Sequence, residues 1–267
     1  MSVKGAGAQK KLVAIEIGRD WLKMIEVERP GRDAAVSRLH LERIDENDPS
    51  LNEAVSTAFR QGHFSSDFVI LSIPRQMVTV RILKLPSLDR DEVADMVELQ
   101  VGKQTPYSRE EIMWDYRVVG AERDGYTRVM LVIAQRSVVR HRVNLLEGAG
   151  VSVDMVSVST EGLLNWMEAA GVDPGNGRGV VVADMDSLCT DVNLSVNGAS
   201  AFSRSVRIGA HQVAEAPDAW MDRLAGEIRR SIEISRGEMS GLEIDRIVFR
   251  GARPATQKEA DGIGAAT

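Results

Sequence analysis

The chain contains one structural unit twice: three predicted strands, a helix and a further strand. The first copy opens with an apolar strand at residues 11–18, and the second copy opens with one at residues 179–186. Each opening strand ends in an acid, Glu16 in the first copy and Asp184 in the second. Strands and helices in this order fold into a covered sheet, so the duplication predicts two similar α/β halves. We expect function to lie where the two acidic strand ends face each other.

In the first copy, apolar and polar residues alternate along three stretches, as in half-buried strands. Asp48 followed by Pro49 is typical of a helix start, with Asp48 as the capping residue. Gly62 is expected to end that helix. The predicted elements of the first copy are strands at residues 12–18, 21–28 and 35–44, a helix at residues 49–62 and a strand at residues 68–73.

The second copy repeats this order. Asn197-Gly198 predicts a two-residue hairpin turn, because both central positions of that turn favour positive φ. Gly251 and the residues after it are expected to end the last strand, and residues 255–267 are expected to form a helix. The predicted elements are strands at residues 179–185, 188–196 and 199–208, a helix at residues 218–238 and a strand at residues 244–249.

A block of different character separates the two copies, at about residues 74–150. Its order of strand, helix, two strands and helix predicts a small α+β module inserted into the first half. Asp89, with Glu92 three residues on, is typical of a helix cap. The last helix of the block is expected to face inward through Val138, Leu145 and Leu146. Residues 173–177 are the expected flexible linker before the second copy.

Composition narrows the classes of function. A net charge of −6 and an aromatic content of 4% argue against nucleic-acid binding, which uses basic faces and stacking platforms. The single cysteine, Cys189, excludes an internal disulfide, and the four histidines lack metal-ligand spacing. No apolar run reaches the roughly 20 residues of a transmembrane helix. We therefore expect a cytoplasmic protein without a metal, a catalytic residue or a membrane span.

Several segments, taken in order, resemble the PilM family of type IV pilus assembly proteins, which are actin-like relatives of the cell-division protein FtsA. The cytoplasmic part of the type II secretion protein GspL has a similar fold. The resemblance covers about residues 11–251 and depends on order and spacing more than on any single motif. Its segments are residues 14–18 (AIEIG), 82–86 (ILKLP), 104–107 (QTPY), 114–116 (WDY), 147–151 (EGAGV), 202–209 (FSRSVRIG) and 227–233 (EIRRSIE).

The resemblance implies an α/β, actin-like fold of two ribonuclease H-like βββαβ halves with an inserted α+β subdomain. The implied domains are residues 11–74 with 151–177 for the first half, 75–150 for the insertion and 178–267 for the second half. This fold normally continues with another strand and helix, so the second half is expected to be incomplete at its C-terminal end.

The family's nucleotide site can be transferred residue by residue. Family members usually have Asp-x-Gly at both acidic strand ends, whereas this chain has Glu16-Ile17-Gly18 and Asp184-Met185-Asp186. Family members normally have Gly-Gly after the last strand, in the segment that contacts the nucleotide base. This chain has Arg250-Gly251-Ala252 there. Loss of glycine hinders the close approach of backbone to phosphate, and an added carboxylate repels it. The resemblance therefore implies weak or lost Mg-ATP binding, at Glu16, Gly18, Lys23, Asp184, Asp186, Glu227, Arg230 and Gly251.

The resemblance also implies a scaffold that works at the bacterial inner membrane. In the family, a groove between the first half and the inserted module binds the short N-terminal cytoplasmic peptide of the membrane protein PilN. An assembly ATPase and self-association are further expected partners. A GspL-like secretion scaffold, an active Mg-ATPase and an FtsA-like filament former stay open as alternatives. The candidate partner-binding residues are Val78, Val80, Ile82, Leu83 and Leu85.

Overall fold

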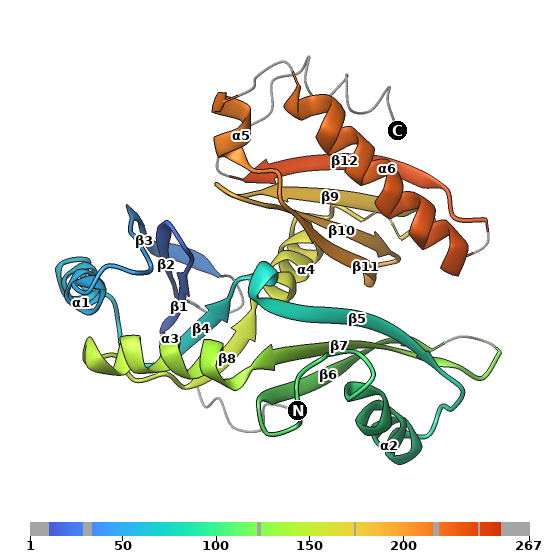
Figure 1. Ribbon diagram of the computed structural model, residues 1–267, viewed down its shortest axis with the longest axis horizontal. Helices are drawn as coiled ribbons and strands as arrows, with labels where there is room; N and C mark the ends of the chain where they lie inside the picture. The colour runs from blue at the N-terminus through green and yellow to red at the C-terminus, as the bar shows by residue number, and fades with distance from the viewer. Residues whose placement is uncertain are drawn as a thin grey trace. The chain divides into compact units, whose positions relative to one another are not determined.

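The structure is a computed structural model, and it describes residues 11–28, 34–121, 124–173, 175–215, 219–239 and 241–251. The chain divides into two compact units (Figure 1). Unit 1 falls within residues 1–77 and 135–159, and unit 2 falls within residues 78–134 and 160–267. The helix expected at residues 255–267 lies outside the described residues.

Unit 1 is built on a five-stranded sheet in the order β3-β2-β1-β4-β8. Apolar residues of β1 and β2 alternate, and those on one face are buried: Val13, Ile15 and Ile17 of β1 with Leu22 and Met24 of β2. Helices α1 and α3 pack against each other, and α3 also contacts β4. The elements are β1 (Lys11–Ile17), β2 (Trp21–Glu28), β3 (Ala35–Arg43), α1 (Leu51–Gln61), β4 (Val69–Ile73), α3 (Arg136–Gly148) and β8 (Met155–Val158).

Two helix details of unit 1 correct the sequence predictions. Helix α1 begins at Leu51 after Ser50, and Asp48 instead accepts hydrogen bonds from the Ser50 amide (2.8 Å) and hydroxyl (2.7 Å). An Asx turn of this kind competes with the capping position, which explains the shift. In α3 the buried face is Val139, Arg142 and Leu146, because an arginine supplies the inward position that periodicity assigned to an aliphatic residue.

Glu26 on β2 has a fully buried side chain. Its carboxylate accepts hydrogen bonds from the Ser65 amide (2.6 Å) and the Ser37 hydroxyl (2.8 Å), and it forms an ion pair with Arg38. Burial alone would raise the pKa of this carboxyl, but these partners hold the pKa below the ordinary value. Glu26 therefore links β2, β3 and the segment that precedes β4.

The lowered pKa of Glu26 predicts an acid-sensitive contribution to stability. That contribution is present above the ordinary pKa of 4.5 and is lost as the pH falls through the folded value. We expect Glu26→Gln to be less stable than the unaltered chain at neutral pH, with a gap that shrinks below pH 4.5. Urea unfolding of both chains across this pH range measures the gap, and a gap that does not change with pH would contradict the prediction.

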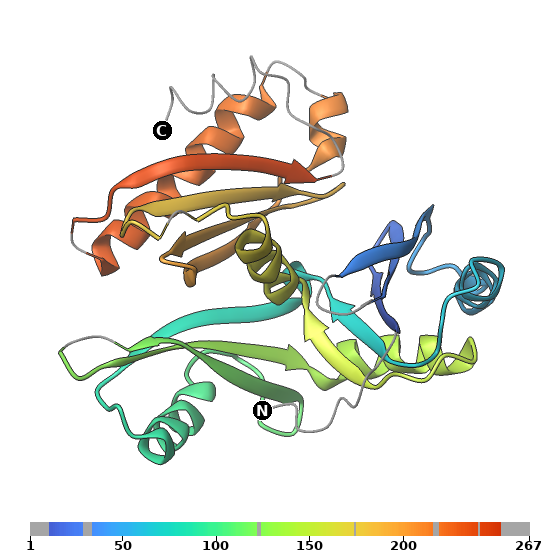
Figure 2. The same cartoon turned by 180° about the vertical axis from the view of Figure 1, so that it is seen from behind.

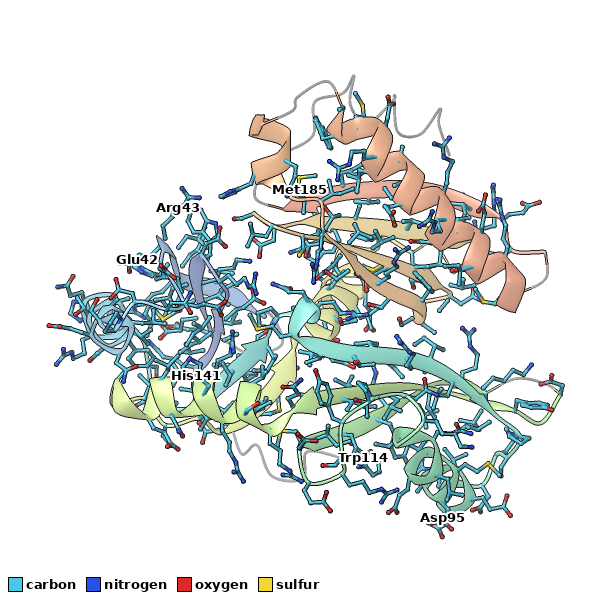
Figure 3. The ribbon with its side chains drawn as sticks, in the orientation of Figure 1. Glu42, Arg43, Asp95, Trp114, His141 and Met185 are labelled. Carbon is cyan, nitrogen blue, oxygen red and sulfur yellow. The ribbon has the colours of Figure 1, made fainter. Side chains whose placement is uncertain are left out.

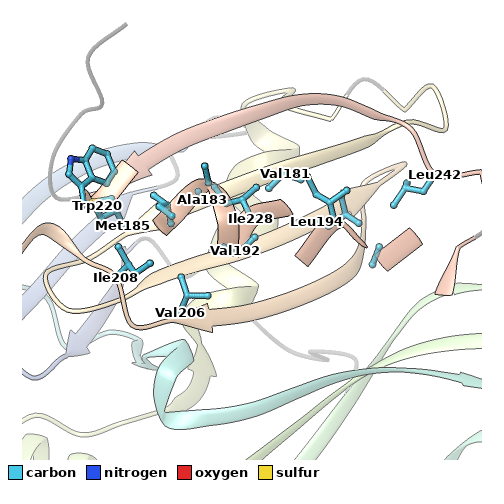
Figure 4. Packing of buried hydrophobic residues seen from close by; sticks show 14 residues of the cluster. Val181, Ala183, Met185, Val192, Leu194, Val206, Ile208, Trp220, Ile228 and Leu242 are labelled. Atoms are coloured by element: carbon cyan, nitrogen blue, oxygen red, sulfur yellow. The ribbon is translucent and has the colours of Figure 1, made fainter. Parts of the chain in front are cut away.

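Unit 2 contains the sheet of the second copy, in the order β11-β10-β9-β12. The expected hairpin turn is confirmed, with φ of 53° at Asn197 and 75° at Gly198. The long helix α6 buries Trp220, Leu224 and Ile228 in a core shared with this sheet (Figure 4). The elements are β9 (Gly179–Met185), β10 (Thr190–Val196), β11 (Ala199–Val206), α5 (Ala210–Glu215), α6 (Trp220–Glu238) and β12 (Ile244–Gly251).

The segment expected to be a flexible linker is instead attached to the β10–β11 hairpin. The Asp173 carboxylate accepts hydrogen bonds from the Ser195 hydroxyl and the Gly198 amide, both at 2.8 Å. Burial raises the pKa of Asp173, and these hydrogen bonds outweigh burial and lower it. The Gly177 amide also donates to the Asn197 side chain at 2.8 Å. Glycine and proline content predicted a flexible linker, because it carries no information on these hydrogen bonds to the hairpin.

Unit 2 also contains a three-stranded sheet in the order β5-β7-β6, with α2 on one face (Figure 2). Asp89 caps α2 as expected, accepting from the Asp91 amide at 2.9 Å and the Glu92 amide at 3.0 Å. The sequence prediction missed β8 and α4, which are short and weakly periodic. The elements are β5 (Val78–Leu85), α2 (Arg90–Val101), β6 (Ile112–Ala121), β7 (Thr127–Gln135) and α4 (Ser159–Ala169), preceded by a 3-10 turn at Arg75–Met77.

The predicted order of three strands, helix and strand recurs in both copies, and the second copy has one further short helix, α5, that was not predicted. The inserted block has the predicted strand-helix-strand-strand-helix order, but its last helix, α3, lies in unit 1. The predicted domain boundaries at residues 74, 150 and 177 stay predictions.

Candidate functional site

The first acid, Glu16, is paired across the sheet. It lies near the carboxyl end of β1, directly opposite Lys23 of β2. The Lys23 ammonium lies 2.9 Å from Glu16 Oε1, and the Ser72 hydroxyl of β4 donates to Oε2 at 3.5 Å. The Glu16 carboxylate is mostly buried and already carries a cationic partner. Lys23 neutralises this acid, and its contact with a phosphate stays a prediction.

A buried arginine lies beneath the same strand end. Arg142 of α3 donates from Nε to the Ile17 carbonyl at 3.1 Å, and its Nη2 lies 3.3 Å from Glu46 Oε2. Burial lowers the pKa of this guanidinium, and the nearby carboxylates of Glu46 and Glu16 oppose that shift. Arg19 lies 3.1 Å from the other Glu46 oxygen. The strand end in unit 1 is therefore a network of ion pairs, in which Lys23, Arg142 and Arg19 face the carboxylates of Glu16 and Glu46.

The second acid, Asp184, is also paired across the sheet. It lies near the end of β9, opposite Arg250 of the parallel strand β12. Arg250 Nε lies 3.2 Å from Asp184 Oδ1, and its guanidinium carbon lies 4.6 Å from the ring centroid of Trp166 on α4. Asp191 of β10 is the antiparallel partner of Asp184. Like charges directly opposite each other destabilise a sheet, so Arg250 offsets a repulsion as well as neutralising Asp184.

The remaining candidate nucleotide residues have local structural roles. Gly18 donates its amide to the Trp21 carbonyl at 2.9 Å, closing the turn between β1 and β2. Asp186 accepts from the Ser187 amide at 2.9 Å. Glu227 of α6 lies 2.8 Å from Arg204 of β11 and 3.7 Å from Arg230, so it joins the helix to the sheet.

Gly251 ends β12 where two strands approach closely. Its φ is 127°, and a Cβ at this position would lie 1.9 Å from the Met185 carbonyl oxygen. No side chain fits there without movement of β9 or β12. Strand β12 includes Gly251 as its last residue, two residues beyond the predicted end at residue 249. The glycine is required by strand packing, whether or not a nucleotide base binds nearby.

The candidate partner stripe on β5 is divided between core and surface. Val78, Val80 and Leu85 are buried, and Leu85 belongs to the core beneath α2. Ile82 and Leu83 are half-buried. The strand itself is an edge of its three-stranded sheet.

The sequence analysis missed how the acids are paired. Arg250 was noted only as a departure from a glycine pair, and Trp166 and Arg142 were not singled out as site residues. Cross-strand register is the signal that finds Lys23 and Arg250, since each lies directly opposite its acid. No sequence pattern reveals Arg142 or Trp166, because they come from helices that only tertiary packing brings to the strand ends.

Two βββαβ copies, each with an acid near the carboxyl end of its first strand, define an actin-like fold. Solved structures agree. The structure of the PilM-PilN type IV pilus biogenesis complex matches with a TM-score of 0.74 and 16% identity, covering 97% of this chain and 87% of that one. A Bacteroides thetaiotaomicron protein of actin-like ATPase fold and unknown function matches at 0.56 and 11%, covering 94% and 85%.

The cytoplasmic domain of EpsL, an inner-membrane component of the Vibrio cholerae type II secretion system, matches with a TM-score of 0.52 and 9% identity, covering 96% and 94% of the two chains. No curated protein matches the sequence. The family model for type IV pilus assembly protein PilM matches residues 10–218. The chain therefore belongs to the PilM family, as the resemblance indicated.

Proposed function

We propose that this protein is a cytoplasmic actin-like scaffold of a type IV pilus machine, which binds the N-terminal cytoplasmic peptide of a PilN-like inner-membrane protein. Family membership and the likeness to PilM from a PilM-PilN complex support the pilus role. The EpsL likeness leaves a type II secretion scaffold as the alternative, with a lower TM-score. No helix among the described residues is long and apolar enough to span a bilayer. The protein would be held at the membrane through its partner.

The pairing of both acids is the observation that favours a scaffold over an ATPase. An actin-like ATPase needs its strand-end carboxylates to hold a magnesium ion and its water. Here Glu16 is bonded to Lys23 and Asp184 to Arg250, so each acid is already neutralised by its cross-strand neighbour. A magnesium ion at either acid would have to displace the cationic partner of that acid. We infer that nucleotide binding is weak or absent and that catalysis is vestigial.

Titration with Mg-ATP tests this inference. We expect the unaltered chain to show no saturable binding tighter than about 1 mM by isothermal titration calorimetry. The double variant Lys23→Ala, Arg250→Ala removes both cationic partners and shows whether this pairing is the cause, since tighter binding by the variant would indicate that pairing prevents nucleotide binding. Sub-millimolar binding or ATP hydrolysis by the unaltered chain would favour the ATPase alternative.

The partner peptide is expected on β5. An extended peptide gains affinity from backbone hydrogen bonds at a strand edge and register from alternate side chains. Because Val78, Val80 and Leu85 are buried and Leu83 packs against the core beneath α2, Ile82 is the member of the stripe through which we expect a peptide to contact β5.

Calorimetry with the N-terminal peptide of the PilN-like protein from the same organism tests this site. We expect Ile82→Glu to weaken peptide binding at least about tenfold, about 1.4 kcal/mol, because it adds a charge to an apolar contact. Val118→Glu is the matched control, since Val118 is exposed on β6, the opposite edge of the same sheet. Equal weakening by both variants, or no peptide binding by the unaltered chain, would contradict the proposal.

A further inference from the structure

Strand β3 is an unpaired edge with an exposed apolar stripe. It ends the five-stranded sheet of unit 1, and β2 is its one strand partner among the residues that the structure describes. Three large apolar side chains stay exposed on it: Val36 at 61%, Leu39 at 66% and Leu41 at 58%. Exposed edges are usually protected by charged side chains, especially lysine, by proline, by a β-bulge or by a covering segment. The nine residues of β3 include Arg38, Glu42 and Arg43 and one irregularity but neither lysine nor proline, and the apolar stripe stays exposed beside these charges.

An irregularity in the pairing of β2 with β3 places Val36, Leu39 and Leu41 on the same face of the sheet. Opposite β2, Val36 pairs with Val27, Leu39 with Ile25 and Leu41 with Lys23, and the ladder is irregular between Glu26 and Val27. The irregularity inserts Ser37, so Val36 lies on the same face as Leu39 and Leu41 despite the odd spacing. From Arg38 to Glu42 the ladder is regular. This regular stretch can accept another strand.

The stretch is complementary to itself in one antiparallel register. Alternate residues of a strand direct their backbone groups to the same edge, so the twofold axis of two identical strands must fall on a residue. An axis at His40 brings Arg38 opposite Glu42 of the second copy, and Leu39 opposite Leu41 of the second copy, twice each. An axis at Arg38 would oppose like charges, and an axis at Leu41 would oppose Leu39 to Arg43.

We propose that two copies of this chain associate through β3, antiparallel, with His40 at the twofold axis. In this register, Arg38 and Glu42 can each still form an ion pair with the second copy. Arg38 is bonded to the buried Glu26 but its side chain is one-third exposed, and a guanidinium has five N–H donors. Glu42 lies 2.9 Å from His40 through one oxygen, which leaves the other free of that contact. Glu42 and Arg43 project from this strand in Figure 3.

Sedimentation equilibrium tests the dimer. One pair of strands makes a small interface, and small interfaces are usually weak. The protein concentration should therefore be varied from about 1 μM to about 1 mM. We expect the unaltered chain to dimerise and Leu41→Lys to raise the dissociation constant at least tenfold. Leu99→Lys is the matched control, because Leu99 is 70% exposed on α2 of unit 2 and does not belong to the β3 sheet. A monomeric unaltered chain at the highest concentration, or equal weakening by Leu99→Lys, would overturn the proposal.

Disulfide formation tests the register. Under mild oxidation, His40→Cys should give disulfide-linked dimers, and the unaltered chain, with Cys189 as its one cysteine, should not. A mixture of Leu39→Cys and Leu41→Cys chains should cross-link more than either chain alone. Faster cross-linking of Leu39→Cys with itself would place the axis elsewhere and reject this register. Loss of PilN-like peptide binding in Leu41→Lys, with the unaltered chain monomeric, would assign the edge to that partner and overturn self-pairing.

Discussion

Replacing Gly251 by alanine should destabilise the second half of the protein by about 3 kcal/mol or more, because it combines backbone strain with overpacking. The added methyl group would lie 1.9 Å from the Met185 carbonyl oxygen, and a φ of 127° is a conformation that alanine rarely adopts. Relief requires β12 to move away from β9, which separates Arg250 from Asp184. Urea unfolding monitored by circular dichroism measures the loss.

The same substitution at Gly226 is the control for Gly251. Gly226 lies inside α6 of the same half, and a Cβ there would have no neighbour within 4 Å. Alanine favours a helix interior over glycine by about 1 kcal/mol, so Gly226→Ala should raise stability. Opposite signs for the two variants are expected. An unchanged unfolding midpoint in Gly251→Ala would show that β12 does not approach β9 as described.

Replacing Arg142 by methionine should lower the free energy of unfolding by about 3 kcal/mol. This value is at the lower end of what is found when one partner of a buried ion pair is removed. The substitution leaves the Ile17 carbonyl without its donor and Glu46 without its buried partner, while the apolar volume stays similar. Because Glu16 lies near this guanidinium, the unit 1 strand end should also lose order. Denaturant unfolding measures the first effect.

Arg140 provides the comparison for Arg142. It lies two residues earlier on α3 and is exposed, so Arg140→Met should change stability by less than about 0.5 kcal/mol. Amide hydrogen exchange at Ile17 and the β1–β2 turn should speed up in Arg142→Met and not in Arg140→Met. If the two variants unfold at the same denaturant concentration, Arg142 does not secure the end of β1.

Much of the fold follows from local sequence. The alternation of β1 and β2, the positive-φ turn at Asn197-Gly198 and the Asp89 cap each depend on residues close together in the chain. Such signals are readable because they need no knowledge of what lies opposite. The repeated βββαβ order then restricts the architecture to the actin-like arrangement, which the solved structures confirm.

The positions of the two acids of the candidate site could be predicted from the sequence, but their ion-pair partners could not. The acids Glu16 and Asp184 lie at the strand ends where the sequence put them. Their partners were not readable, because Arg250 is 66 positions from Asp184 and reaches it only through the parallel register of β12 and β9. Likewise the inward position of Arg142 on α3 could not be predicted, since its hydrogen-bond acceptors come from β1 and the segment before α1.

The sequence by itself determined the duplicated strand-helix order, the acids at the strand ends and membership in the PilM family. Local periodicity and turn chemistry suffice for these, because they act over a few residues. Only the tertiary structure decided that each acid carries a cationic neighbour, that Gly251 permits strand contact and that β3 presents an open apolar edge. These features depend on which residues of distant segments lie opposite each other. Local sequence patterns do not reveal that pairing, because it is set when the sheets pack.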